Sequence, residues 1–166
     1  MLQRLSTGHI VWRLDESCSG SLSPKLIELL SKWAQHSFWS REAGGLLLGF
    51  IDNETEGLLG EFATTPGRGD RRSRTSFYRG PRHQQEAIEW NRVTDRRGTQ
   101  LGLWHTHPEL DPTPSPTDLE DCRNVLATGK FAVDGILYLI VGTRSIGCWF
   151  AKSGSPLVLL GYFPHE

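Results

Sequence analysis

Two histidines separated by one residue are the side chains of this 166-residue sequence best suited to chemistry. They close the segment Gln100–His107, which we expect to be a β-strand. Side chains of a strand alternate between its two faces, so His105 and His107 point the same way. Two imidazoles on one face can bind one metal ion, each at about 2.0–2.1 Å. Pro108 disfavours helical backbone at His107 and cannot donate to a strand ladder, which predicts that the histidines lie at a strand end.

A carboxylate follows the histidines at a defined position. Prolines stiffen the return loop, which ends at Ser115 and Pro116. Serine is a preferred N-cap and proline a preferred first helical residue, so a helix is expected at Pro116–Ala127. Asp118 then lies in the first helical turn, free to face the histidines. Two histidines and one carboxylate form a set that binds catalytic zinc and leaves one coordination position open.

The serine and the aspartate also have a purely structural explanation. A serine N-cap with an acid three residues later stabilises a helix by about 1 kcal/mol without any catalysis. The paired histidines favour a metal site, because two histidines beside an acid are costly to bury without a metal. Four acidic neighbours are alternative ligands, although such clusters are more often solvated: Glu109, Asp111, Glu120 and Asp121.

The spacing His-x-His, seven residues, Ser, two residues, Asp resembles the JAMM motif of MPN-domain metallopeptidases. Glu42, which precedes the apolar run Gly44–Ile51, resembles the general acid/base glutamate of that family. The resemblance implies that one Zn²⁺ is bound by His105, His107 and Asp118. It implies that Glu42 takes a proton from water and gives it to the leaving amine, and that Ser115 donates a hydrogen bond to the developing oxyanion.

Within that family, the compact chain is similar to the bacterial (prokaryotic JAB) branch, and most of all to the deconjugating isopeptidases of CBASS anti-phage operons. This likeness implies hydrolysis of the bond between the C-terminus of a cGAS/DncV-like nucleotidyltransferase, conjugated in the manner of ubiquitin, and its target. The expected partner is therefore a protein with a flexible C-terminal tail. The alternative function in the same branch is trimming the C-terminus of a sulfur-carrier or other ubiquitin-like protein.

Six arginines form the one charge cluster that supports a rival hypothesis: Arg68, Arg71, Arg72, Arg74, Arg79 and Arg82. Phe77 and Tyr78 interleave them, as in binding modules for nucleic acid or for a phosphorylated partner. The net charge of −1 and the pI near 6.6 argue against nucleic acid as the main ligand. The cluster is then either a solvated face or a surface that binds an acidic protein substrate.

The expected elements mix strands and helices without strict alternation, and their length fits one domain over residues 1–166. We expect helices beginning at Pro24 and covering Pro81–Arg96 and Pro116–Ala127, a loop at 66–74, and strands at His9–Leu14, Gly44–Ile51, Gly57–Thr64, Thr75–Arg79, Gln100–His107, Ile136–Val141, Ser145–Ala151 and Pro156–Phe163. The fold class is α+β (α/β-like), with a central mixed, largely antiparallel sheet flanked by helices. The family resemblance implies the MPN/JAMM, cytidine-deaminase-like architecture.

The remaining residues are expected to be structural. Three widely spaced cysteines, Cys18, Cys122 and Cys148, predict buried inert thiols in a reducing cytosol. The six tryptophans are expected to belong to the core and scaffold. His9, His36, His83 and His165 receive no role. The first residues lack the apolar segment of a signal peptide, and no apolar run approaches about 18 residues, which predicts a cytoplasmic protein without membrane contact.

Overall fold

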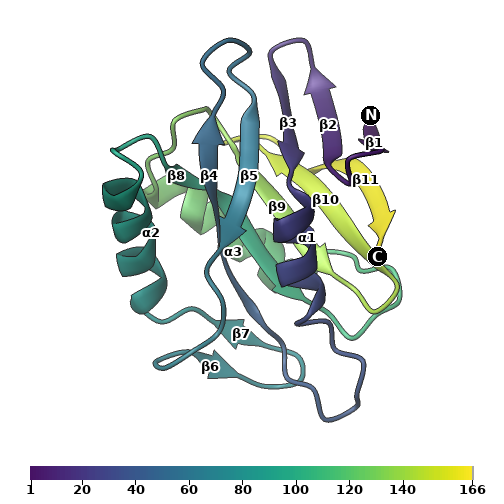
Figure 1. Ribbon diagram of the computed structural model, residues 1–166. Helices are drawn as coiled ribbons and strands as arrows, with labels where there is room; N and C mark the ends of the chain where they lie inside the picture. The colour runs from purple at the N-terminus through teal and green to yellow at the C-terminus, as the bar shows by residue number, and fades with distance from the viewer. Residues whose placement is uncertain (166) are drawn as a thin grey trace.

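A computed structural model describes residues 1–165 and consists of one large sheet with three helices packed against it (Figure 1). The helices are α1 (Pro24–Ser31), α2 (Arg82–Val93) and α3 (Pro116–Thr128). The strands are β1 (Leu2–Arg4), β2 (Ile10–Asp15), β3 (Cys18–Leu22), β4 (Gly44–Ile51), β5 (Leu58–Ala63), β6 (Arg71–Arg72), β7 (Phe77–Tyr78), β8 (Thr99–Thr106), β9 (Ile136–Val141), β10 (Ser145–Ala151) and β11 (Val158–Pro164).

The large sheet is mixed and largely antiparallel, as predicted. Its nine described strands run in the order β1-β2-β3-β5-β4-β8-β9-β10-β11. Only β3–β5 and β8–β9 pair in parallel. The last three strands form the expected antiparallel meander. A separate two-stranded sheet, β6–β7, lies beyond the end of the large sheet from which β4 starts (Figure 1).

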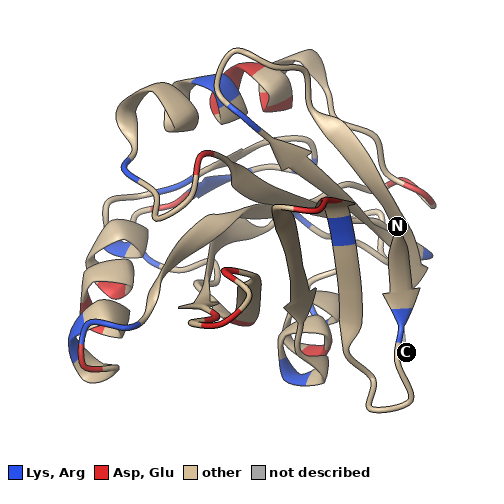
Figure 2. Ribbon diagram, turned by 90° about the horizontal axis from the view of Figure 1, so that it is seen from above, with Lys and Arg blue, Asp and Glu red and all other residues tan. Residues whose placement is uncertain are grey.

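Alternating apolar residues give the sheet two buried faces. Leu47 of β4 packs in the same cluster as Leu26 of α1, whereas Leu46 packs with Ala87 of α2 and Cys122 of α3. Successive strand residues point to opposite faces, so α1 covers one face while α2 and α3 cover the other. Seen from above, helices lie on both sides of the sheet and carry acidic and basic residues intermixed (Figure 2).

Several sequence-based expectations hold for individual elements. The bounds of β4, β9 and β10 agree with the prediction, and α3 differs from it by one residue at its C-terminal end. Cys18, Cys122 and Cys148 are buried free thiols, and burial raises the pKa of Cys122 to about 11.

No helix among residues 1–165 is both long and apolar enough to cross a membrane.

Other expectations are wrong. Strands β1 and β3 were not predicted, and the loop expected at 66–74 contains the short strand β6. Ile88, an apolar residue within the helix expected at Pro81–Arg96, is 63% exposed. The buried residues of this helix are His83, which had received no role, and Ala87. Trp39 is 86% exposed and therefore does not belong to the core.

Candidate metal and catalytic site

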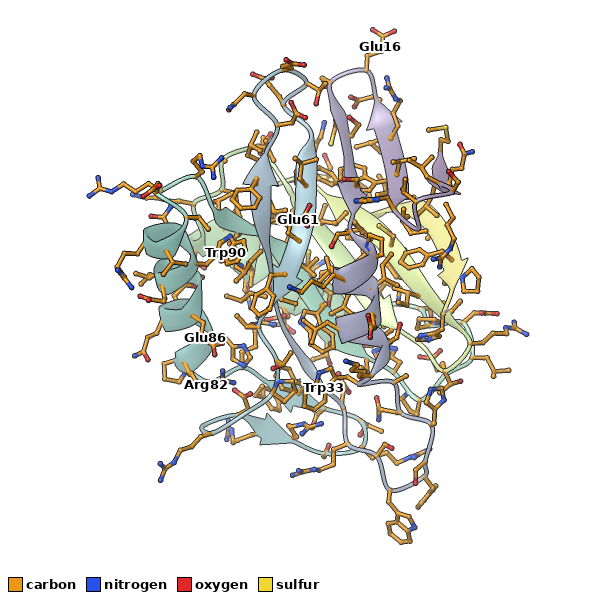
Figure 3. All side chains as sticks on the ribbon, in the orientation of Figure 1. Glu16, Trp33, Glu61, Arg82, Glu86 and Trp90 are labelled. Carbon is orange, nitrogen blue, oxygen red and sulfur yellow. The ribbon has the colours of Figure 1, made fainter. Side chains whose placement is uncertain are left out.

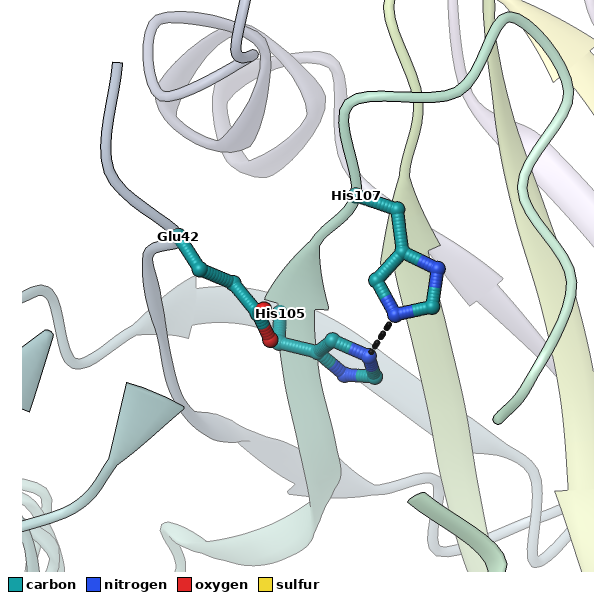
Figure 4. Close-up of side chains that lie close together, drawn as sticks. All are labelled: Glu42, His105 and His107. Atoms are coloured by element: carbon teal, nitrogen blue, oxygen red, sulfur yellow. Dashed lines mark hydrogen bonds between the residues drawn. The ribbon is translucent and has the colours of Figure 1, made fainter. Parts of the chain in front are cut away.

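The antiparallel pairing of β4 with β8 brings Glu42 to the two histidines. Gly44 pairs with His105, and the amide of Thr106 donates to the carbonyl of Ala43 at 2.9 Å. Extending this antiparallel register by one residue beyond Ala43 and Thr106 places Glu42 opposite His107. Figure 4 shows the three side chains approaching one another from the starting end of β4 and the final end of β8. All three are buried, and each offers a ligand atom within 4.8 Å of the others'.

Three atoms of the predicted ligands converge on one point. The Nε2 atoms of His105 and His107 are 3.0 Å apart. Asp118 Oδ2 lies 3.2 Å from the first and 3.1 Å from the second. Tetrahedral zinc with bonds of about 2.0–2.1 Å has ligand atoms roughly 3.3 Å apart, so the triangle fits a small divalent ion. Glu42 also lies near both histidines, but Asp118 is the carboxylate that touches both of the converging nitrogens.

The start of α3 fixes the position of Asp118. Ser115 is the N-cap, and its Oγ accepts from the amide of Asp118 at 3.1 Å. In return, Asp118 Oδ2 accepts from the amide of Ser115 at 2.8 Å. This reciprocal capping box confirms the helix start expected from the sequence. The same carboxylate oxygen that closes the box also faces the histidines, so the cap orients Asp118.

Glu109 has a contact that the sequence did not reveal. Its Oε1 lies 2.7 Å from His107 Nδ1. An ionised carboxylate only accepts hydrogen bonds, so His107 Nδ1 must donate, and the neutral ring then carries its lone pair on Nε2. Histidines that bind metals generally donate their other ring nitrogen in this way. Glu109 is therefore neither a free solvated charge nor one of the converging atoms.

The other acidic neighbours have partners away from the converging atoms or lie in solvent. Asp111 forms an ion pair with Arg144 and accepts from Ser145 Oγ at 2.7 Å, which fastens the return loop to the turn between β9 and β10. Both oxygens of Asp121 accept from Arg79, at 2.9 and 3.0 Å. Glu120 is exposed. None of these three is among the converging atoms.

Burial and mutual contact shift the titration of the cluster. Burial raises the pKa of Glu42 to about 7; His107 lowers it by a smaller amount, and the negative charge of Asp118 raises it further. Burial also lowers the pKa of His105. Burial acts against the charged form of Asp118, but hydrogen bonds from the two histidines overcome it and lower the Asp118 pKa. The contact with Asp118 likewise outweighs burial at His107 and raises its pKa. The charged forms of Asp118 and His107 are thus favoured, whereas the charged form of His105 is disfavoured.

A pocket of about 450 Å³ opens over the cluster. Glu42, Ser115 and the three converging residues line it, together with the stretch 75–79, Pro108, Glu109, Thr117, Asp121 and Tyr138. Tyr138 lies beside His105, with ring centroids 5.5 Å apart. Sequence reasoning missed Tyr138 and the Arg79–Asp121 pair. The sequence signals that could have indicated these residues are the position of Tyr138 in a predicted strand and that of Asp121 one helical turn after Asp118.

The site does not lie beside an edge of the large sheet. Strand β8 is central, paired with β4 on one side and β9 on the other. The two-stranded sheet contributes to the pocket wall, because its strand β7 (Phe77–Tyr78) lines the pocket. Strand β7 is therefore the described edge strand that lines the pocket.

Most arginines of the predicted basic cluster are engaged within the protein. Arg72 donates to the carbonyl of Glu42 at 2.8 Å, and Arg74 donates to that of Phe38 at 2.6 Å. Arg79 pairs with Asp121. Arg82 contacts Asp70, Glu86 and the carbonyl of Thr65. Only Arg68 and Arg71 are exposed, so the cluster is not a single open basic face.

A third buried histidine, His83, lies in a separate cluster at the start of α2. His83 Nε2 is 2.9 Å from Asp70 Oδ2, and His83 Nδ1 is 2.6 Å from Thr64 Oγ1. Thr64 Oγ1 accepts from the amide of Leu46, and Asp70 accepts from the amides of residues 67 and 80. The cluster ties the loop that carries β6–β7 to β4 and α2. Figure 3 shows Arg82 near this end of α2, and Trp90, which stacks on Phe62 and donates to the carbonyl of Gly49, on the same helix.

Comparison with known proteins places this architecture in a family. Residues 23–152 match the model of prokaryotic homologs of the JAB domain. A protein of Pseudomonas aeruginosa named CD-NTase/cGAS isopeptidase is 40% identical over 126 residues, 75% of this chain and 77% of the relative. Proteins of the same name in Escherichia coli and Vibrio cholerae are 32% and 29% identical, over 77% and 93% of this chain and 78% and 94% of theirs.

Among solved structures, the solution structure of a protein from Desulfitobacterium hafniense has a TM-score of 0.61. The match covers 83% of this chain and 87% of that protein, and at 24% identity it supports the fold alone. The names of the relatives support the predicted hydrolase class. The family expected from the His-x-His, Ser and Asp spacing is confirmed: this chain belongs to the prokaryotic JAB-domain family.

Proposed function

We propose that this protein is a zinc-dependent isopeptidase that detaches a conjugated protein from its target by cutting at the C-terminus of the conjugated protein. One observation carries the proposal. Two histidine nitrogens and a carboxylate oxygen converge within 3.0–3.2 Å of one another, beside a buried glutamate and on the wall of an open pocket. His105, His107 and Asp118 would hold one Zn²⁺, which would supply Lewis-acid activation of water and of the scissile carbonyl.

The conjugated protein is proposed to be a nucleotidyltransferase of the CD-NTase/cGAS kind, in antiviral defence. This part of the proposal draws on the name shared by three relatives that match most of the chain. The reaction would then take place in the cytoplasm, within the single domain formed by residues 1–166.

Glu42 is proposed to move the proton. Glu42 is only 5% exposed as a residue, and its pKa near 7 lets it accept a proton and release it again at neutral pH. The carbonyl of Glu42 accepts from Arg72 Nε and its amide donates to the carbonyl of Ser73, so its backbone is held from both sides. A fixed backbone lets one carboxylate serve as base toward water and as acid toward the leaving amine.

Ser115 is proposed to donate to the oxyanion while it caps α3. The cap uses the hydroxyl oxygen only as an acceptor, from the amide of Asp118. A serine hydroxyl has one donor and two acceptor positions, so its hydrogen remains available for the pocket that Ser115 lines. Capping and catalysis are thus compatible at this residue.

The substrate tail is proposed to lie extended along the wall formed by residues 75–79. Pairing with the edge of β7 would give it backbone hydrogen bonds, the strand-addition mode of recognition. A pocket of about 450 Å³ takes few side chains, which favours small residues such as glycine or alanine before the scissile bond. The leaving amine would belong to a lysine side chain or to an α-amino group.

Cleavage of a defined fusion tests the proposed function. A CD-NTase/cGAS-type nucleotidyltransferase is joined through its C-terminal tail to a reporter protein and incubated with the enzyme. We expect one cut, at the last residue of the tail, that a chelator abolishes and added Zn²⁺ restores. An intact fusion together with cleavage of a sulfur-carrier tail would establish the alternative function instead. Activity that survives complete metal removal would contradict the zinc mechanism.

A further inference from the structure

Two large aromatic side chains project into solvent from the loop between α1 and β4. Phe38 is 67% exposed and Trp39 is 86% exposed. Their rings meet edge to face, with centroids 5.3 Å apart, and so form one continuous apolar surface. Tryptophan is largely buried in most proteins, and contiguous exposed apolar surface often marks a binding site. We call Phe38 and Trp39, with the adjacent Arg41 and Arg74, the aromatic tip.

The loop that carries the aromatic tip is held by specific contacts. Arg74 donates to the carbonyl of Phe38 at 2.6 Å, and its guanidinium lies 4.3 Å from the centroid of the Phe38 ring. The amide of Trp39 donates to Ser37 Oγ at 3.2 Å, and the amide of Ser40 donates to the carbonyl of Ser37 at 3.0 Å. The two rings are thus exposed on a bonded loop. Groups already held in place lose less conformational freedom when they bind.

One buried side chain connects the aromatic tip to the strand of the two histidines. Gln35 is 3% exposed, and its Oε1 accepts from Thr106 Oγ1 at 2.7 Å. Its Nε2 donates to the carbonyls of Ser40 and Arg74, at 3.2 and 2.9 Å. Thr106 lies between the two histidines in sequence. The loop after α1 and the β6–β7 hairpin accordingly lie at the same end of the molecule as the pocket (Figure 1).

The aromatic tip lies in a region of positive charge. The segments 31–41 and 71–79 contain six Lys and Arg residues and no Asp or Glu. Lys32 and Arg79 have acidic partners, on α1 and α3 respectively. Tryptophan and arginine are the residue types that most often dominate the binding energy of protein interfaces. An exposed Trp–Phe pair beside arginines therefore fits a protein surface with an apolar centre and an acidic rim.

We propose that the aromatic tip is an exosite that binds the folded body of the protein whose tail is cleaved. The inference rests on the proposed function and adds a second contact to it. Neither Phe38 nor Trp39 lines the pocket, so tail binding and body binding are physically separate. A small pocket that accepts small tail residues distinguishes poorly between tails. The exosite supplies the selectivity for the correct conjugate.

Exposed aromatic and arginine side chains also occur in proteins that bind single-stranded nucleic acid, where bases stack on the rings. The fixed connection of the tip to the peptidase pocket, through Gln35, favours a protein partner. The overall charge of −1 offers no general attraction for a polyanion.

Two substrates with the same scissile tail separate the exosite from the pocket. One is the intact nucleotidyltransferase–reporter fusion, and the other is a free peptide that contains only the tail and the residues after the cut. We expect Trp39→Ala and Phe38→Ala each to lower kcat/KM for the fusion about tenfold, mainly through KM, because truncation of an aromatic hot spot typically has an effect of this size. The peptide should be cleaved by both variants within about twofold of wild type. Ile88→Ala, which removes another exposed side chain from α2, is the control and should change neither value.

A binding measurement makes the test independent of turnover. Wild-type protein should bind the nucleotidyltransferase with its tail deleted, and Trp39→Ala should bind it about tenfold more weakly. Unchanged fusion cleavage and unchanged body binding in both aromatic variants would overturn the exosite while leaving the proposed function intact. Equal losses on fusion and peptide would also overturn it. Tip-dependent binding of a single-stranded oligonucleotide, without binding of the body, would assign the tip to nucleic acid. If wild type cleaves neither substrate but binds the body through Trp39, the proposed function fails and the exosite stands.

Discussion

The protein contains two buried clusters of histidine and carboxylate that satisfy their polar atoms in opposite ways. In the cluster around His83, each ring nitrogen has its own protein partner. Nε2 faces Asp70, and Nδ1 faces Thr64, whose hydroxyl accepts from the amide of Leu46. A consistent chain of donors and acceptors runs through this cluster, from Leu46 to the carboxylate. It needs no ion.

In the other cluster, three atoms that can each present a lone pair meet at one point. His107 donates Nδ1 to Glu109, so its neutral ring has no proton on the converging Nε2. His105 Nε2 and Asp118 Oδ2 complete the triangle, with sides of 3.0–3.2 Å. The three atoms have the spacing of ligands around a small divalent ion, whereas each ring nitrogen of His83 has a separate hydrogen-bond partner. We infer that convergence of lone pairs, more than burial or the presence of histidine, distinguishes the proposed metal site from the structural network.

Removal of one converging nitrogen should have the largest effect on activity. His107→Ala is expected to lower kcat/KM for the reporter fusion by at least about 10³-fold, because metal-ion catalysis contributes several kcal/mol. The matched variant is His83→Ala, which removes an equally buried imidazole from the structural cluster. It should retain cleavage within about tenfold when assayed below its unfolding temperature. Comparable losses in the two variants would remove the distinction between the clusters.

Replacement of the proposed proton carrier should separate metal binding from turnover. Glu42→Gln keeps the size of the side chain and removes its titration. We expect the zinc content to stay at the wild-type level while kcat falls about 10²–10⁴-fold, the usual contribution of general acid–base catalysis. Parallel measurement of metal content and single-turnover rate checks both parts. Normal cleavage by this variant would transfer the role to another acid of the pocket, and loss of zinc would make Glu42 a ligand.

Ser115 should affect both stability and rate, because it is a cap that also lines the pocket. Ser115→Ala is expected to lower the free energy of unfolding by about 1 kcal/mol and kcat by about 10²–10³-fold. Ser115→Thr keeps a hydroxyl that can cap the helix and should recover most of the stability. Denaturation curves and kcat for the two variants decide the matter. A less stable Ser115→Ala protein with wild-type kcat would show that the serine only caps α3.

Asp70, in the cluster around His83, should make the stability of the fold depend on pH. Burial acts to raise the pKa of Asp70, but hydrogen bonds from the amides of Gly80 and Gly67 and from His83 lower it overall. A lowered folded-state pKa stabilises the protein above the unfolded-state value of about 3.9, and this contribution disappears as the pH falls through the folded-state pKa. Asp70→Asn should therefore lower Tm near neutral pH and flatten the loss of Tm below about pH 4. If wild type and variant lose Tm in parallel on acidification, Asp70 has no such role.

The sequence predicted the local structure from the two histidines to Ser115 well because its constraints are local. Alternation along β8, Pro108 and the Ser115 cap each act over a few residues, and the structure agrees with them except that β8 ends at Thr106, one residue before the predicted end. Continuous apolar runs likewise defined β4, β9 and β10, since strands covered on both faces are apolar throughout.

Contacts between distant segments could not be predicted from these local patterns. Strand β3 reads Cys-Ser-Gly-Ser-Leu, without a periodic apolar pattern, and exists through pairing with β2 and β5. The partners Asp70 and His83 lie 13 residues apart, and Arg79 and Asp121 lie 42 apart. The apolar character of Trp39 suggested burial, whereas only the course of its loop determines that it faces solvent. The order of strands, which makes β8 central, has the same non-local origin.

Metal analysis of three purified proteins tests the central claim most directly. Wild type and His83→Ala should each hold about one zinc ion per chain, while the double variant His105→Ala, His107→Ala should hold almost none and keep the far-ultraviolet circular dichroism of a folded protein. This result would assign the metal to the converging cluster and exclude the structural one. Stoichiometric zinc in the double variant, or its loss on removal of His83 alone, would contradict the account.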